Sequence, residues 1–150
     1  MSGLRIAGHP LHPALVHFPV ACWTAAPVLD GGYLLTQDPV WWQAEFWCLA
    51  VGVGMGLVAM GAGFMDLLAI PSGHAGEATA HRHMLLMGSA WSVFVAVLVL
   101  HPLRGLPSPL QAWTDLGLSL LGFGLLGLGA YAGARLVYDF GIGRNPEPRP

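Results

Sequence analysis

Four long apolar stretches, at roughly 14–35, 43–69, 84–103 and 112–138, constrain this chain more than any other feature of its sequence. A helix needs about 20 apolar residues to cross the hydrocarbon core of a membrane, and each stretch reaches that length. Only 9% of the residues are charged and the mean hydropathy is +0.60, whereas a soluble domain has about 25% charged residues. The sequence therefore predicts an all-α fold: a single integral membrane domain over residues 1–150, built as a four-helix transmembrane bundle.

The arginines predict how this bundle is oriented. If each stretch crosses the membrane once, five of the six arginines fall on the face that carries the N-terminus: Arg5, Arg82, Arg135, Arg144 and Arg149. Positively charged residues concentrate on the cytoplasmic side, so both termini are predicted to be cytoplasmic, in the inner membrane of a bacterium. The chain has no lysine and a net charge of -2, which excludes a basic surface for nucleic acid. Residues 144–150 are expected to form a flexible tail.

Several local features shape the expected helices. Pro10 and Pro13 are expected to prevent a helix from starting before Ala14. Asp30 and Asp115 lie near the predicted outer interface, where we expect them to be solvated. Glycine-rich runs in the second and fourth stretches are typical of closely packed membrane helices. No internal repeat is evident in the sequence.

The histidines are the strongest indication of a function. Six of the seven fall on the predicted N-terminal face of the bundle: His9, His12, His17, His74, His81 and His83. His101 alone falls on the other face, and we expect it to have no functional role. Ionisable residues within membrane segments usually mark a functional site, so this concentration of imidazoles indicates a cofactor.

Haem b is the cofactor that this pattern favours, because it requires two imidazoles on different helices at similar depth. His17 lies about one turn inside the first stretch and His83 begins the third, so their depths differ by about one turn. We predict that these two are the axial ligands of a haem in a membrane electron carrier, with His12 as the alternative ligand from the first helix. A covalently attached c-type haem is excluded because no Cys-x-x-Cys-His segment occurs.

Three further residues are expected to support such a haem. Arg82 and Arg135 lie at a depth from which they can pair with the propionates. An imidazole ligand usually donates its second N–H to a carboxylate or a carbonyl, and Asp66 lies on the same face of the bundle.

Two other interpretations remain open. The chain can be a cofactor-free structural or accessory subunit of a larger membrane redox complex, or a homo-oligomer, in which its glycine faces pack against partner helices. It can also hold a transition metal without haem, through a set drawn from His9, His12, His17, His81 and His83. No nucleophile–base pair is evident, so an electron carrier or an accessory subunit is favoured over a stand-alone enzyme.

The motifs also resemble a known family. The segment 9–19, HPLHPALVHFP, is similar to the opening motif of a bacterial membrane family named domain of unknown function 2231, and the resemblance continues through residues 61–66, 83–86 and 133–143. It implies four membrane helices, relatives fused to Rieske-type or c-type cytochrome domains, and His12, His17, Asp66 and His83 as functional residues. The family commonly has a histidine where this chain has Phe140, which makes a second haem less expected here.

Overall fold

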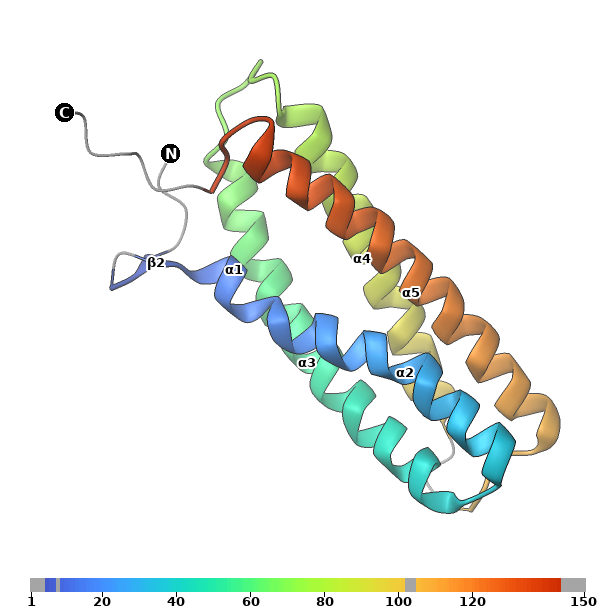
Figure 1. Ribbon diagram of the computed structural model, residues 1–150. Helices are drawn as coiled ribbons and strands as arrows, with labels where there is room; N and C mark the ends of the chain where they lie inside the picture. The colour runs from blue at the N-terminus through green and yellow to red at the C-terminus, as the bar shows by residue number, and fades with distance from the viewer. Residues whose placement is uncertain (1–4, 8, 102–104, 144–150) are drawn as a thin grey trace.

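The chain folds into four long antiparallel helices, preceded by two very short strands and a short helix (Figure 1). The computed structural model describes residues 5–7, 9–101 and 105–143. In chain order the elements are β1 (Arg5–Ile6), β2 (His9–Pro10), α1 (Leu11–Leu15), α2 (His17–Thr36), α3 (Pro39–Leu68), α4 (Glu77–Leu100) and α5 (Pro109–Tyr138). β1 and β2 pair in the antiparallel direction. The tail predicted to be flexible, 144–150, lies outside the described residues.

The predicted all-α class is confirmed, and the described residues contain three helices that are long and apolar enough to cross a membrane. These are α3, α4 and α5, with 30, 24 and 30 residues. The sequence predicted a fourth span where α2 now lies. α2 has 20 residues and contains Pro27 and Asp30, which lower its hydropathy relative to the other three. It packs along α3 and α5 and completes the bundle.

Three of the four long helices, α3, α4 and α5, begin earlier than the corresponding apolar stretches. α3 begins at Pro39, where the Asp38 side chain accepts a hydrogen bond of 2.9 Å from the backbone N–H of Val40, and α4 begins at Glu77. Hydropathy does not detect a polar first turn that a capping residue stabilises. The expectation that no helix precedes Ala14 is wrong, because α1 contains Pro13. In a first turn proline has no intrahelical hydrogen bond to lose.

The bundle is built from two equivalent helical hairpins, α1–α2–α3 and α4–α5. Pro39 and Pro109 both open a long helix, and each follows a residue whose side chain caps that helix. Each buried residue of α3 has a buried counterpart in α5 whose residue number is larger by 70. The pairs are Trp42 and Ala112, Glu45 and Asp115, Leu49 and Ser119, Gly52 and Gly122, Gly56 and Leu126, Ala59 and Gly129, and Ala62 and Ala132. The sequence analysis missed this repeat, because it is a repeat of burial more than of residue type.

A shift of 71 residues relates the first helices of the two hairpins in the same way. Trp23 corresponds to Phe94 and Ala26 corresponds to Val97, and all four residues are buried. Each hairpin packs internally, and the first helix of each also packs on the last helix of the other, as α2 on α5 and α4 on α3. Both hairpins start at the same end of the bundle (Figure 1). The arrangement is therefore a parallel repeat with a pseudo-two-fold axis along the bundle.

The centre of the bundle lies on this axis. The rings of Trp23 and Phe94, which occupy equivalent positions, stack with centroids 5.1 Å apart and planes inclined by 12°. Glycines make room for both rings. A Cβ atom at Gly52 would lie 2.8 Å from Nε1 of Trp23, and one at Gly122 would lie 2.8 Å from Cε2 of Phe94. Both distances are too short for a real contact, so the helices approach this closely only because these positions lack side chains.

This packing gives a first prediction. Gly122→Ala should lower the free energy of unfolding by about 1–3 kcal/mol, because the added methyl group must displace the buried Phe94 ring. Gly124→Ala is the matched control, since a Cβ there meets nothing within 4 Å and alanine favours the helix by about 1 kcal/mol over glycine. Chemical unfolding in detergent micelles, followed by circular dichroism, measures both. Equal effects of the two substitutions would contradict the close approach at Gly122.

Candidate functional site

His12 is held against α3 near the end of the bundle where α1 lies. It belongs to α1, and its Nδ1 atom lies 2.8 Å from the carbonyl oxygen of Ala59. Because a carbonyl only accepts hydrogen bonds, Nδ1 carries the proton and donates it. A Cβ atom at Gly63, one turn further along α3, would lie 2.9 Å from Cε1 of the ring. Glycine at this position therefore leaves the space that the imidazole occupies.

His83 repeats this arrangement on the second hairpin. It belongs to α4, and its Nδ1 atom donates to the carbonyl oxygen of Gly129 on α5, also at 2.8 Å. A Cβ atom at Gly133 would lie 3.0 Å from Cε1 of the ring. Both histidines are half-buried. The carbonyls of Ala59 and Gly129 are related by the 70-residue shift, so the pseudo-symmetry extends to the hydrogen bonds of the site.

The two imidazoles lie next to each other, edge to face, on either side of the pseudo-two-fold axis. Their centroids are 6.4 Å apart and the ring planes are inclined by 84°. Since Nδ1 of each ring holds the proton, Nε2 of each ring has a free lone pair, which is the form in which histidine binds a metal. A metal–imidazole bond is about 2 Å long and the ring centre lies about 1 Å beyond the nitrogen, so two imidazoles on opposite sides of one metal ion have centroids about 6 Å apart. The observed centroid separation is close to this value.

The structure thus brings His12 next to His83, where the sequence analysis had favoured His17. His17 is exposed, and its Nδ1 lies 3.4 Å from the carbonyl oxygen of Ala14 in the preceding turn. The depth estimate had counted residues along one continuous helix from Ala14. In the structure α1 ends at Leu15 and α2 begins at His17, so the two histidines of this segment lie on different helices.

The other predicted ligands lie apart from this pair. The Nδ1 atoms of His9 and His81 lie 3.0 Å from the carbonyl oxygens of Ala7 and Glu77, close to each histidine in sequence. His74 accepts a hydrogen bond of 3.0 Å from the backbone N–H of Gly76. Among the residues that the structure describes, no group of three or more His, Cys, Asp or Glu side chains is arranged as a metal site. The proposed metal set of His9, His12 and His81 is therefore not assembled there.

Asp66 lies in the last turn of α3, three residues after Gly63, and is half-buried. The sequence analysis expected its carboxylate to accept the N–H of a ligand imidazole. In the structure the Nδ1 atoms of His12 and His83 donate to main-chain carbonyls instead. Either kind of acceptor fixes the orientation of an imidazole ligand.

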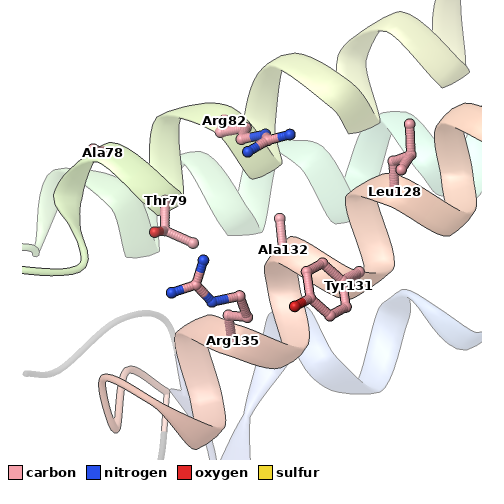
Figure 2. A pocket seen from close by; sticks show the side chains of 7 residues that line it. All are labelled: Ala78, Thr79, Arg82, Leu128, Tyr131, Ala132 and Arg135. Carbon is pink, nitrogen blue, oxygen red and sulfur yellow. The ribbon is translucent and has the colours of Figure 1, made fainter.

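The arginines expected near the propionates line a pocket between α4 and α5. Figure 2 shows the side chains of Arg82 and Arg135 reaching into this space from the two helices, with Thr79 and Tyr131 beside them. The pocket has a volume of about 220 Å³. Arg135 also forms an ion pair of 2.7 Å with Asp139, one turn further on. Two guanidinium groups and a hydroxyl can hold a carboxylate or phosphate group there.

A second group of polar residues, which the sequence did not indicate, lies at the opposite end of the bundle. The expectation that Asp30 and Asp115 are solvated is wrong, because their exposed fractions are 2% and 0%. Glu45 and Ser119 are buried beside them. His101 is also buried, and its ring stacks on that of Trp42 with the two centroids 3.9 Å apart. One signal was available: Glu45 and Asp115 each lie six residues after a helix-opening proline.

Comparison with known proteins places the chain in a family without assigning an activity. No curated protein and no solved structure matches the sequence. Residues 8–146 match the family described as predicted membrane protein (DUF2231). This match covers the opening histidine motif, all four long helices and the glycine-containing end of α5. The chain therefore belongs to the DUF2231 family of predicted membrane proteins.

Proposed function

We propose that this protein is a b-type cytochrome-like electron carrier that binds one haem between His12 and His83. The observation that carries the proposal is the pair of neighbouring imidazoles, 6.4 Å apart, each with Nδ1 bonded to a carbonyl and Nε2 left free. His12 takes the place that the sequence analysis gave to His17. The bilayer and a redox protein, or a larger membrane complex, are the expected surroundings.

The number of donors favours haem over a bare metal ion. A structural zinc site uses four protein ligands and a catalytic one about three. The porphyrin of a haem supplies four nitrogen ligands itself, which leaves two positions for the protein. Two imidazoles from different helices, related by a pseudo-two-fold axis, match that requirement.

The residues of the chain have separate roles in this proposal. His12 and His83 would hold the iron of a haem, and the bound haem would supply one-electron redox chemistry. The carbonyls of Ala59 and Gly129 accept hydrogen bonds from Nδ1 of the two imidazoles, which fixes the orientation of the rings and leaves Nε2 as the atom that would bind the iron. Gly63 and Gly133 leave the space that the two rings occupy. Arg82, at the same end of the bundle, supplies positive charge for a propionate.

An accessory subunit of a membrane complex is the second candidate, and one observation favours it. Several glycines on the outer faces of α3 and α5 are exposed and have no side chain near the position of a Cβ: Gly54, Gly61, Gly117, Gly124 and Gly127. Two pairs among them are spaced by seven residues, which places each pair on one face of its helix. Such faces allow another helix to approach closely.

A visible absorption spectrum tests the proposal directly. Full-length protein, produced with added haem precursor and purified in detergent, should show a sharp α-band after reduction with dithionite. The low-spin form is expected because both axial positions of the iron are filled by imidazole. A pyridine haemochrome assay should give one haem per chain. Protein that remains colourless after incubation with haem would refute the cytochrome proposal and leave the accessory-subunit function.

A further inference from the structure

Three carboxyl groups from three different helices meet inside the bundle, at the end opposite His12 and His83. Asp30 belongs to α2, Glu45 to α3 and Asp115 to α5, and their exposed fractions are 2%, 0% and 0%. Asp30 lies six residues before the end of α2, and the other two lie six residues after the start of their helices. At 1.5 Å per residue all three are about 9 Å from the helix ends. We call these three residues, together with Ser119, the carboxyl layer.

The side chains of the carboxyl layer interact with one another. Glu45 interacts electrostatically with both Asp30 and Asp115, and Asp115 interacts with Asp30. Glu45 and Asp115 are also equivalent positions of the two hairpins, so they approach from opposite sides of the pseudo-two-fold axis. Yet within the described residues none of the six carboxyl oxygens has a partner at hydrogen-bonding geometry.

Ser119 supplies an independent observation. Its exposed fraction is 0%, and its hydroxyl oxygen has no partner at hydrogen-bonding geometry among the described residues. It lies one turn after Asp115 on α5, and its side chain is directed toward Asp30. A buried hydroxyl without a partner costs free energy, so Ser119 indicates that hydrogen-bond donors and acceptors are shared among the oxygen atoms of this layer.

The charge of the three carboxyl groups indicates what binds in the carboxyl layer. Three ionised carboxylates packed together away from water would repel one another and lack hydration, and a buried charge without a counter-charge is strongly unfavourable. The arginines whose side chains the structure describes, Arg82 and Arg135, lie toward the other end of the bundle. The described residues also contain no group of carboxylates arranged to hold a metal ion.

We propose that the carboxyl layer is a proton-binding site within the membrane. A carboxylate that accepts a proton from hydronium becomes a carboxylic acid and releases one water molecule. Each acid can donate O–H to a neighbouring carboxyl oxygen, so protons supply the missing hydrogen bonds as well as the missing positive charge. Ser119 serves as a further donor and acceptor in this network.

One imidazole lies between the carboxyl layer and the nearer end of the bundle. On α3, Trp42 lies one turn before Glu45 and stacks on His101, which follows the last residue of α4. The Nε2 atom of His101 lies 3.2 Å from the carbonyl oxygen of Trp42. His101 is therefore the nearest described imidazole through which a proton can pass between this end of the bundle and the carboxyl layer, and it acquires a role that the sequence did not predict.

This site is independent of the proposed haem. On α3, Ala59, whose carbonyl binds His12, lies fourteen residues after Glu45, and Gly129 lies fourteen residues after Asp115 on α5. The two polar layers are thus about 21 Å apart along the bundle, with the apolar Trp23–Phe94 contact between them. Proton binding at the carboxyl layer does not require that the histidines bind haem.

Infrared spectroscopy of the full-length protein in detergent tests this proposal. At neutral pH the spectrum should contain the carbonyl stretching band of protonated carboxylic acids, and this band should shift in heavy water. Glu45→Gln, Asp30→Asn and Asp115→Asn should each remove part of the band, and the double variant of Glu45 and Asp115 most of it. Asp139→Asn is the control, because Asp139 is exposed and paired with Arg135, and this variant should keep the whole band.

Two results would overturn the proposal. One is a spectrum of the wild-type protein at neutral pH with carboxylate bands alone. The other is a protonated band that disappears when sodium or calcium chloride is added, which would identify the layer as a metal cation site. The amide variants are close in size to the native residues and are expected to fold. If one does not, the heavy-water shift of the wild-type band still tests the proposal.

Discussion

His12→Ala and His83→Ala should each abolish the reduced α-band of the haem-loaded protein or convert it to a high-spin form. In the proposed cytochrome each substitution would remove one of the two ligands of the iron, together with the imidazole–carbonyl contact that orients it. Because the two imidazoles occupy equivalent positions around the pseudo-two-fold axis, the two variants should lose haem to a similar extent. Visible spectra of the oxidised and reduced proteins, with haem content per chain, measure the effect.

His17→Ala and His81→Ala are the matched controls for these variants. Both histidines are exposed; His17 lies five residues after His12, and His81 lies two residues before His83 on the same helix. Their variants should keep the α-band of the wild-type protein. If His17→Ala lost the haem while His12→Ala retained it, the assignment of the first-helix ligand would be wrong, and the original choice of His17 would be restored.

Trp23→Ala should destabilise the bundle more than any other single apolar truncation. Trp23 is 1% exposed, stacks on Phe94 and fills the space left by Gly52 and Gly56. Truncating a buried tryptophan costs about 3–5 kcal/mol, part of which comes from the cavity left behind. In a membrane lipid replaces water as the solvent, so the cavity and the lost contacts dominate, and we expect a loss of about 3 kcal/mol.

Trp47→Ala provides the comparison for this variant, because Trp47 is 67% exposed on α3. The free energy of unfolding in detergent should change by less than about 0.5 kcal/mol for this surface substitution. Similar midpoints for the two variants would show that Trp23 does not lie at the centre of the packed bundle.

The fold class followed from the sequence because hydropathy is a local property. Each apolar stretch contains enough residues to require burial or lipid, and their spacing allows only short connections. The ends of the helices were less predictable. Asp38 and Pro39 stabilise the first turn of α3 through a cap, and a cap contributes nothing to an average of hydropathy.

The candidate haem site was only partly predictable. His83 was identified because it lies at the start of an apolar stretch, and His12 was retained as an alternative ligand. Choosing between His12 and His17 required knowing that the helix is interrupted at Val16, between α1 and α2. Pro13 and Pro19 do not specify whether one helix or two will form there.

The internal repeat and the carboxyl layer were determined by tertiary structure alone. Equivalent positions share burial while their residue types differ, as Leu49 and Ser119 do, so a comparison of residues does not detect the repeat. Asp30 and Asp115 are separated by 85 positions in the chain and resemble interface residues when each is considered alone. The sequence by itself determined that this chain forms apolar helices with histidines at one end. Only the packing of four helices around a common axis brought His12 to His83 and Asp30 to Glu45, because contacts between distant segments depend on helix rotation, which local composition does not specify.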